Sequence, residues 1–383
     1  MKRIVVCCDG TWNQWTGDHP TNVVRVAQAV SLTAPGDAPG NAIPQIVFYD
    51  EGVGTGGGLI DRIRGGAFGY GLDKNVEDAY RFLVNNYEQG DEIYLFGFSR
   101  GAYTARSTAG VIRKCGLLTK QNGMKIGAAL SLYRLRDSSP DLEETLRFRR
   151  ENSHPNPVLP SDDRYAYVVR IHFLGVWDTV GSLGVPLRSL RWVPWNNRYK
   201  FHDERLSSTV KNAFHAVSID EQRGSYEPTL WDQVPAEGQR VEQTWFAGVH
   251  SEVGGGSSER GLSSLALGWM IDKARECGLA FDEPQVREIK AEADPAEKVD
   301  KSLSGVWRFL VPYHRRIGIT QPVKAGLSNS ESLHPSVCVK LNTAAPPYRP
   351  ENVSAYLKRS DRRMTAVGAE PWNQPPANRW PDL

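Results

Sequence analysis

The sequence predicts an α/β fold built on a doubly wound, mainly parallel sheet. Two observations lead to this expectation. Short apolar runs rich in β-branched residues alternate along the chain with longer segments whose apolar residues recur at three- and four-residue spacings. The short runs are continuously apolar, which is typical of strands that are buried on both faces of a parallel sheet. Repetition of strand, helix and strand is the pattern of a doubly wound sheet.

Five strands and four helices are expected from these patterns. The strands cover residues 4–8, 45–49, 93–96, 168–177 and 243–249. The helices cover residues 22–32, 75–87, 100–118 and 262–277. Parallel sheets of this kind bind ligands at the carboxyl ends of their strands, so the residues that follow each strand are the first candidates for function.

The spacing of these elements predicts how the chain is divided. We expect one α/β domain over residues 1–340, with helical or loop insertions at about 120–165 and 185–235 that form a cap. Residues 341–383 are rich in Pro and Trp and are expected to be an irregular tail. A chain of 383 residues is long enough to bury the core that this arrangement needs.

The composition excludes several classes of protein. Hydrophobic residues make up 40% and charged residues 23%, which is ordinary for a globular protein and rules out a largely disordered chain. The 46 basic and 44 acidic residues are interleaved along the chain, so no nucleic-acid partner is expected. Five cysteines without a C-x-x-C pair argue against a disulfide framework and a structural zinc site. Neither a metal nor another cofactor is expected.

The chain begins with too short an apolar run for a signal peptide, and it contains no run of roughly 18 apolar residues that could span a membrane. We therefore expect a soluble chain that is made in the cytoplasm. Export by a route that reads no N-terminal signal stays open.

The segment GFSRG at residues 97–101 contains the G-x-S-x-G pattern of a nucleophile elbow. The pattern alone is a weak signal in a chain with 36 glycines. Its context is stronger, because a predicted strand precedes Ser99 and a predicted helix follows it, as an elbow requires. Ser99 is therefore the candidate nucleophile, and the sheet is expected to be of the α/β-hydrolase type. A serine that only caps the helix is the structural alternative.

A serine nucleophile needs a base, and the base needs an acid that fixes its tautomer. In this fold the partners follow in the order serine, acid, histidine. Asp178 directly follows the fourth predicted strand and is the candidate acid, with a turn-forming aspartate as the alternative. Among eight histidines, His250 is the first candidate base because it lies at the end of the last predicted strand. His334 and His215 remain alternatives, since a late loop or an insertion could bring either to the site.

The tetrahedral intermediate of such a reaction needs backbone donors. The amide of Arg100, the residue after the candidate nucleophile, is the expected first donor. The second is expected from Thr11 or Gly10, which follow the first predicted strand.

Two further motifs are weaker. A G-x-G-x-x-G match at residues 52–57 is also found in dinucleotide-binding sites, but no clean helix follows it, so no nucleotide cofactor is expected. Cationic and aromatic residues at 191–195 are compatible with a lid at a lipid interface, and a packed surface loop is the alternative.

Six groups of residues carry a joint signal that is more specific than any one of them. They are CDGTWN at 8–13, GVGT at 52–55, FGFSRGA at 96–102, VWDTVG at 176–181, His215 with Asp220, Glu221 and Arg223, and VHSEVGG at 249–255. Together they resemble the catalytic domain of type VI secretion phospholipase effectors. The motifs run from residue 7 to about 280. That family usually has Asp at the position of Glu252.

The resemblance implies an α/β-hydrolase fold, a Ser-Asp-His triad and phospholipase or related esterase activity. We therefore expect a serine hydrolase that cleaves carboxylic acyl esters through an acyl-enzyme. Its expected partner is an acyl-ester or lipid substrate, and peripheral contact with a membrane stays open. The alternative, from a different class, is a catalytically silent domain that serves as a binding or interaction module.

Overall fold

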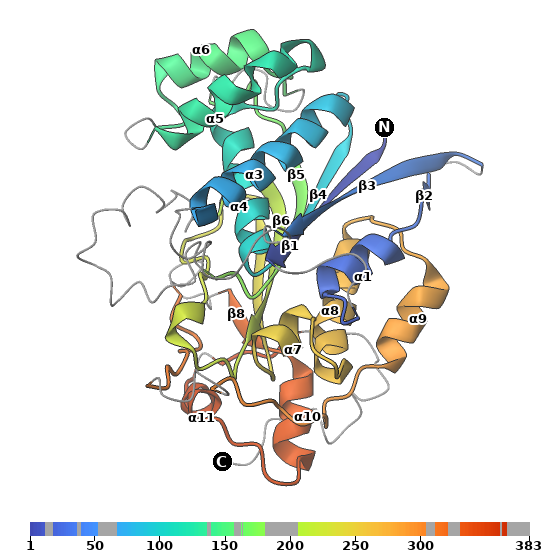
Figure 1. Ribbon diagram of the computed structural model, residues 1–383, viewed down its shortest axis with the longest axis vertical. Helices are drawn as coiled ribbons and strands as arrows, with labels where there is room; N and C mark the ends of the chain where they lie inside the picture. Colours follow the sequence, from blue (N-terminus) through green and yellow to red (C-terminus); the bar gives the residue numbers. More distant parts are fainter. Residues whose placement is uncertain are drawn as a thin grey trace.

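The structure is a computed structural model of the chain (Figure 1). It describes residues 1–11, 18–36, 40–52, 67–135, 139–156, 162, 164–180, 206–303, 311–320, 330–360 and 362–365. The strands in these ranges are β1 (Arg3–Thr11), β2 (Thr33–Pro35), β3 (Ala42–Gly52), β4 (Glu92–Phe98), β5 (Ile171–Trp177), β6 (Val210–Ser218), β7 (Arg240–Phe246) and β8 (Glu331–Leu333). They form one eight-stranded sheet in the order β2-β3-β1-β4-β5-β6-β7-β8. All neighbours are parallel except β2 and β3, which are antiparallel.

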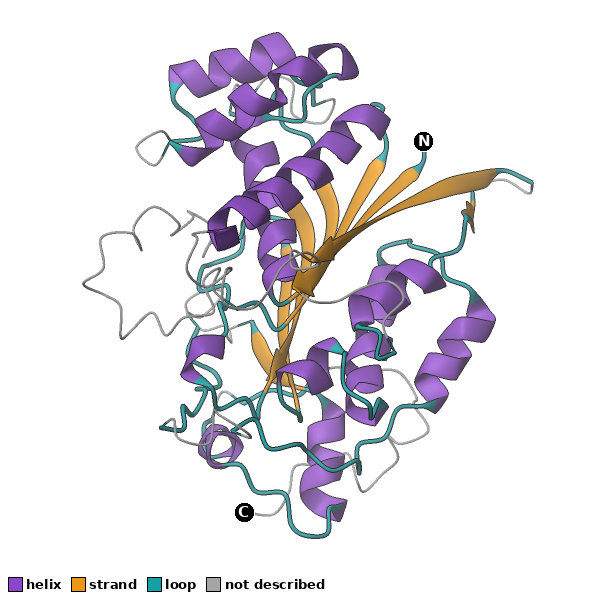
Figure 2. Cartoon of the chain, viewed as in Figure 1, coloured by secondary structure: helices purple, strands orange, loops and turns teal. Residues whose placement is uncertain are grey.

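Helices lie on both faces of this sheet (Figure 2). They are α1 (Asn22–Ala29), α3 (Ala67–Asn86), α4 (Arg100–Cys115), α5 (Ile126–Arg134), α6 (Glu143–Asn152), α7 (His250–Gly254), α8 (Gly261–Glu276), α9 (Glu283–Ala291), α10 (Pro335–Thr343) and α11 (Glu351–Leu357). Two of the described segments are short 3-10 helices, η1 (Lys120–Lys125) and η3 (Gly224–Tyr226). The predicted α/β class and the doubly wound, mainly parallel sheet are confirmed. Among the described residues, no helix combines the length and the apolarity needed to cross a lipid bilayer.

The central strand β1 shows how the sequence specifies the two layers. Its side chains alternate between the faces of the sheet: Ile4, Val6 and Cys8 belong to the core cluster beneath α3 and α4. Val5 and Cys7 belong to the cluster beneath α1 and α8. A strand that is covered on both faces needs apolar side chains at successive positions, which explains the continuous apolar run in the sequence. Burial raises the pKa of both thiols, so both cysteines are packing residues in the protonated form.

Helices α5 and α6, which lie in the first predicted insertion, pack on the carboxyl end of α4 (Figure 1). The Cys115 thiol donates to the carbonyl oxygen of Ala129 at 3.1 Å, and the Arg149 guanidinium donates to that of Arg113 at 2.8 Å. A helix of 16 residues is about 24 Å long at 1.5 Å per residue. Because Ser99 precedes the first turn of α4, α5 and α6 lie far from Ser99 and do not cover it.

The second predicted insertion, residues 185–235, needs correction. It contains β6, an interior strand of the sheet that pairs in parallel with both β5 and β7. The sequence pattern conceals this strand because Lys211, Asn212 and His215 interrupt its apolar residues. His215 is nevertheless fully buried, since its ring nitrogens are hydrogen-bonded within the core. Residues 185–205 lie among those that the structure does not describe.

The segment predicted as an irregular tail begins with packed helices. Leu341 of α10 and Val353, Tyr356 and Leu357 of α11 belong to a third core cluster, together with residues of β6, β7 and β8. The three apolar residues of α11 are spaced by three and four positions, so they face the core together. This helix therefore extends the core beside β7 and β8. Residues 366–383 are outside the described ranges.

Candidate active site

Ser99 lies on the turn between β4 and α4, in a conformation that serine rarely adopts. Its φ is 56° and its ψ is −119°. Such a conformation costs on the order of 1–3 kcal/mol and persists only where the surroundings impose it. The Ser99 N–H donates to the carbonyl oxygen of Trp177 at 3.1 Å, which ties the turn to the end of β5. Within the described part of the chain, the Ser99 side chain makes no capping hydrogen bond to α4.

Two glycines allow this turn to pack against its neighbours. A Cβ atom on Gly97 would lie 2.4 Å from the carbonyl oxygen of Gly101. A Cβ atom on Gly101 would lie 2.0 Å from the carbonyl oxygen of Cys8 on β1. Both distances are far below van der Waals contact, so any larger residue would push α4 away from the sheet. The glycines of the G-x-S-x-G pattern are therefore required by the packing of the turn.

His250 is the first residue of α7 and lies just beyond the end of β7. Its Nε2 is 2.9 Å from Ser99 Oγ, and its Nδ1 is 2.5 Å from Asp178 Oδ2. A carboxylate only accepts hydrogen bonds, so Nδ1 carries the proton and Nε2 is left to accept one from the hydroxyl. This is the arrangement that a general base beside a serine requires.

Asp178 follows β5 with a φ of 37° and is fully buried. Its Oδ1 accepts from the Ser218 N–H at 3.0 Å and from Arg315 Nη1 at 2.6 Å. Its Oδ2 accepts from Arg315 Nη2 at 3.0 Å as well as from His250. Burial by itself would raise the pKa of Asp178, but the charge of Arg315 and the bond from His250 outweigh burial and hold that pKa well below its usual range. The carboxyl group is therefore ionised beside His250.

Two aromatic rings pack on the His250 ring, and a carboxylate bonds to its backbone. The Phe98 ring centroid is 4.7 Å from that of His250, and Tyr226 packs edge-on to it at 4.9 Å. A Cβ atom on Gly254 would lie 1.9 Å from the Phe98 ring, so glycine at that position lets the aromatic ring approach. The His250 backbone N–H donates to Glu221 Oε2 at 3.3 Å. The imidazole is thus held by packing as well as by its two side-chain partners.

Glu252 stabilises the backbone around His250 through hydrogen bonds. Its two carboxyl oxygens accept from the backbone N–H groups of Val249, at 2.8 Å, and Asp300, at 2.9 Å. Burial raises its pKa to about 7. Glu252 is directed at backbone groups, and its contacts explain why a carboxylate is useful at this position.

His215, an alternative base, lies on β6 and is fully buried. The Thr179 N–H donates to its Nε2 at 3.1 Å, and its Nδ1 is 3.3 Å from Gln243 Oε1. Burial, with a smaller effect from the nearby Arg106 charge, lowers its pKa to about 3. Both ring nitrogens are thus directed at the Thr179 amide and at Gln243, so the structure does not bring His215 to Ser99.

His334, the other alternative base, precedes α10 and caps it. Its Nδ1 is 2.8 Å from the hydroxyl of Ser336, and its ring stacks on Phe246 at 4.5 Å. Burial lowers its pKa to about 3. These contacts give His334 a role in holding α10 against the sheet.

The predicted backbone donors lie next to the elbow. Arg100 is the first residue of α4, and Gly10 and Thr11 end β1, the strand on which Gly101 packs. The Gly10 N–H donates to Asp9 Oδ1 at 2.6 Å, and the other oxygen of Asp9 accepts from two hydroxyl groups. Asp9 therefore organises the strand end beside Ser99.

Other predicted motifs lie wholly or largely outside the described residues. These are the glycine-rich match at 52–57, of which only Gly52 is described, and the aromatic and cationic segment at 191–195. Within the described ranges, no group of three His, Cys, Asp or Glu side chains is placed to hold a metal ion.

Comparison with known proteins supplies the family. A family model described as the catalytic domain of Tle1-like phospholipase effectors of the type VI secretion system matches residues 2–273. The chain belongs to this family. The resemblance predicted from the sequence motifs is confirmed, and the matched range contains Ser99, Asp178 and His250.

Relatives of this Tle1-like domain differ in length. An uncharacterized protein of Saccharomyces cerevisiae, YEL023C, is 32% identical over 249 residues, which are 61% of this chain and 33% of the yeast protein. A crystal structure of an uncharacterized protein from Pseudomonas aeruginosa is 22% identical, with a TM-score of 0.38, over 76% of this chain and 48% of that one. The structure of the Tle1 effector bound to the VgrG spike is 17% identical, with a TM-score of 0.38, over 67% of this chain and 52% of that one. The chain therefore spans about a third of the yeast protein and about half of each solved chain.

Several residues around Ser99, Asp178 and His250 are not identified by sequence reasoning. Arg315 contacts Asp178 from a position 137 residues further along the chain, in a segment that has no motif of its own. Tyr226 packs on His250 from a position that carries no distinguishing pattern. Phe98 also packs on His250, and it lies within the motif at residues 96–102, but that motif does not show which ring its side chain contacts. Glu221 belongs to one of the family motifs, which is the signal that could have placed it near His250.

Proposed function

We propose that this protein is a serine esterase or lipase, of the phospholipase A type, which cleaves carboxylic acyl esters through an acyl-enzyme. The observation that carries the proposal is the hydrogen-bonded chain from Ser99 Oγ through His250 to Asp178, which starts at a strained elbow turn. Membership of a family of phospholipase effector catalytic domains supports the same class of reaction.

In the first half-reaction, Ser99 Oγ attacks the ester carbonyl carbon while His250 Nε2 takes the hydroxyl proton. Asp178 remains ionised and stabilises the imidazolium that forms. The tetrahedral intermediate then collapses, and the departing alkoxide takes the proton back from His250. Ser99 is left acylated, and the alcohol is released.

In the second half-reaction, water attacks the acyl-enzyme with His250 again accepting a proton. The carboxylic acid leaves and Ser99 is regenerated. In both intermediates the oxyanion would accept from the amide of Arg100 and from that of Thr11 or Gly10. The positive end of α4 adds to this stabilisation. Gly10 would first have to release its bond to Asp9.

The substrate class is also part of the proposal. A phospholipid or related lipid is favoured by the description of the family, and that description also suggests delivery by a type VI secretion system. Because the chain covers only part of each relative, we assign the lipid substrate and the delivery route to this protein as proposals.

A hydrolysis screen tests the proposal. Purified wild-type protein and Ser99→Ala are incubated with p-nitrophenyl esters of increasing chain length and with phospholipid vesicles, and free acid is measured. We expect hydrolysis by the wild type and a loss of about 10⁵-fold or more in the variant. Release of fatty acid from vesicles supports the lipid substrate, whereas hydrolysis of short esters alone supports an esterase. No hydrolysis of any ester by folded wild-type protein would favour a silent binding module.

A further inference from the structure

Arg315 is a fully buried arginine that contacts Asp178, the acid of the candidate triad. Its side chain and that of Asp178 are both inaccessible to solvent. The two terminal nitrogens of the guanidinium bond separately to the two carboxylate oxygens, at 2.6 and 3.0 Å. This two-pronged geometry suits a guanidinium and cannot be reproduced by an ammonium group.

The same guanidinium also bonds to two backbone carbonyl oxygens, and it thereby links Asp178 to β6 and to η3. Nη1 donates to the carbonyl oxygen of Ser218 at the end of β6, at 2.8 Å. Nη2 donates to the carbonyl oxygen of Tyr226 in η3, at 2.5 Å. The Tyr226 ring packs on His250. Arg315 therefore contacts the acid directly and holds the segment whose ring supports the base.

We propose that Arg315 is a positioning residue of this site: it fixes the orientation of the Asp178 carboxylate, and its charge keeps that carboxylate ionised. The inference rests on the function proposed above and goes beyond it, because Arg315 lies outside residues 2–273, which match the family model. The triad thus depends on a segment of the chain beyond the matched domain.

The electrostatic part of the role follows from the surroundings of Asp178. Among the described residues, the titratable or charged groups that interact with Asp178 are His250 on α7, His215 on β6, Arg223 before η3 and Arg315, and the carboxylate of Glu221 interacts with Arg315. His215 is neutral because burial lowers its pKa to about 3. Arg315 is the cation that contacts both carboxylate oxygens, so its removal leaves a buried anion with one bonded side chain fewer. The pKa of Asp178 would then rise towards its usual range.

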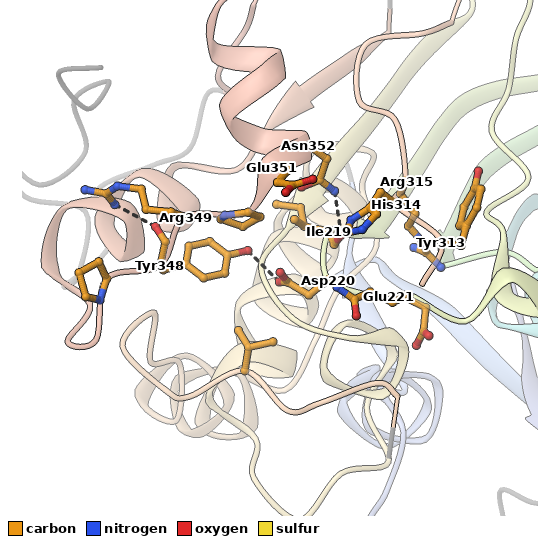
Figure 3. A pocket seen from close by; sticks show the side chains of 14 residues that line it. Ile219, Asp220, Glu221, Tyr313, His314, Arg315, Tyr348, Arg349, Glu351 and Asn352 are labelled. Carbon is orange, nitrogen blue, oxygen red and sulfur yellow. Dashed lines mark hydrogen bonds between the residues drawn. The ribbon is translucent and has the colours of Figure 1, made fainter. Parts of the chain in front are cut away.

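A cavity beside Arg315 makes a chemical test practical. It has a volume of about 380 Å³, and Figure 3 shows Arg315 lining it together with Glu221, His314 and Tyr348. Arg315 lines this cavity and also bonds to Asp178. We expect that shortening the side chain leaves a space next to the cavity, through which a small cation could reach the carboxylate.

The test compares Arg315→Ala and Arg315→Lys with Arg149→Ala. Arg149 is a suitable control because it is also fully buried, but it donates to backbone carbonyl oxygens at the far end of α4. We expect Arg315→Ala to lower kcat about 10- to 100-fold with little change in KM, as loss of an orienting partner does. Its acid limb in the pH profile of kcat should move to higher pH. Arg149→Ala should lose thermal stability but keep its kcat and pH profile.

Guanidinium chloride at about 50 mM, well below denaturing concentrations, should restore much of the activity of Arg315→Ala. Tetramethylammonium chloride, which has the charge but no N–H groups, should not. If Arg315→Ala fails to fold, Arg315→Lys tests the same role. We expect this variant to show a smaller loss of kcat and an acid limb that is also shifted to higher pH. An unchanged rate and pH profile in the folded variants, or equal effects of both cations, would overturn the proposal.

Labelling of Ser99 separates this outcome from failure of the proposed function. A fluorophosphonate probe that reacts with wild-type Ser99, and equally fast with Arg315→Ala and Arg315→Lys at every pH, contradicts the role of Arg315 alone. A probe that does not react with folded wild-type protein contradicts the serine hydrolase itself.

Discussion

The carboxyl edge of the sheet and the far end of α4, where α5 and α6 pack, are both densely packed, and both contain a fully buried arginine. At the far end, Arg149 donates to the carbonyl oxygens of Arg113 and Arg164, and Asp141 lies 4.0 Å from its guanidinium. At the carboxyl edge, Arg315, Asp178, His250 and Ser99 are bonded side chain to side chain. The hydrogen bonds of Arg149 compensate the burial of its own charge. Those of Arg315 lead through Asp178 and His250 to the hydroxyl group of Ser99.

The difference shows which buried polar groups indicate function. Burial of a charged side chain requires hydrogen-bond partners wherever it occurs, so it is poor evidence for a site. A hydrogen-bonded chain of acid, imidazole and strained serine is more informative, because it is arranged to move the hydroxyl proton to the imidazole. We therefore expect similar substitutions to lower activity near Ser99 and to change only stability at the far end of α4.

The largest expected contrast is between two histidines of the carboxyl edge itself. His250→Gln should reduce kcat/KM on the order of 10⁴-fold or more, because no base then accepts the Ser99 proton. His215→Gln should stay within about tenfold of the wild type, since His215 bonds to Thr179 and Gln243. Ester hydrolysis at pH 8, with circular dichroism to verify folding, checks this pair. Equal losses in two folded variants would refute the assignment of the base.

The next contrast compares two aspartates that pair with arginine. Asp178→Asn should lower kcat about 10⁴-fold, and it should destabilise the fold by about 3–5 kcal/mol because Arg315 loses a buried partner. Asp141→Asn should cost less than about 1 kcal/mol and leave kcat intact, since Asp141 is partly exposed in its pair with Arg113. Urea unfolding and steady-state kinetics measure both effects. A fully active Asp178→Asn enzyme would exclude Asp178 as the acid.

A smaller effect is expected from glycine replacements in two helices. Gly101→Ala should destabilise by about 1–3 kcal/mol and lower activity, because the new methyl group meets Cys8 of β1. Gly127→Ala, on α5, meets nothing within 4 Å and should stabilise by up to about 1 kcal/mol. Thermal melting of the two variants provides the comparison. Similar shifts in both melting temperatures would contradict the close packing of the elbow.

The last prediction concerns stability in acid, which builds up gradually with each pH unit. Burial lowers the pKa of His215 and His334 to about 3 in the folded chain, against about 6.5 in the unfolded chain. The unfolded chain therefore binds protons first, so the stability is fully present above about pH 6.5 and is lost as pH falls towards 3. Each histidine should contribute about 1.4 kcal/mol per pH unit in this window. Urea unfolding between pH 4 and 7 should give a shallower slope for His215→Gln, and an unchanged slope would contradict the burial effect.

Much of the sheet could be predicted because its strands carry continuous apolar runs, as in β1 and β4. The same rule fails for β6, where polar residues such as His215 are buried by specific hydrogen bonds that no periodicity reveals. Ser99, Asp178 and His250 could be placed together because each follows a strand, and parallel strands end at one edge. Arg315 could not, because an irregular segment far along the chain brings it to Asp178.

The central claim is that Ser99 is a nucleophile activated by His250, and covalent labelling tests it most directly. Purified protein is treated with a fluorophosphonate probe, and the modified peptide is identified by mass spectrometry. We predict rapid modification of Ser99 in the wild type, at least about 10³-fold slower modification in His250→Gln, and none in Ser99→Ala. Modification of a different residue, or equal rates in the wild type and His250→Gln, would contradict the account.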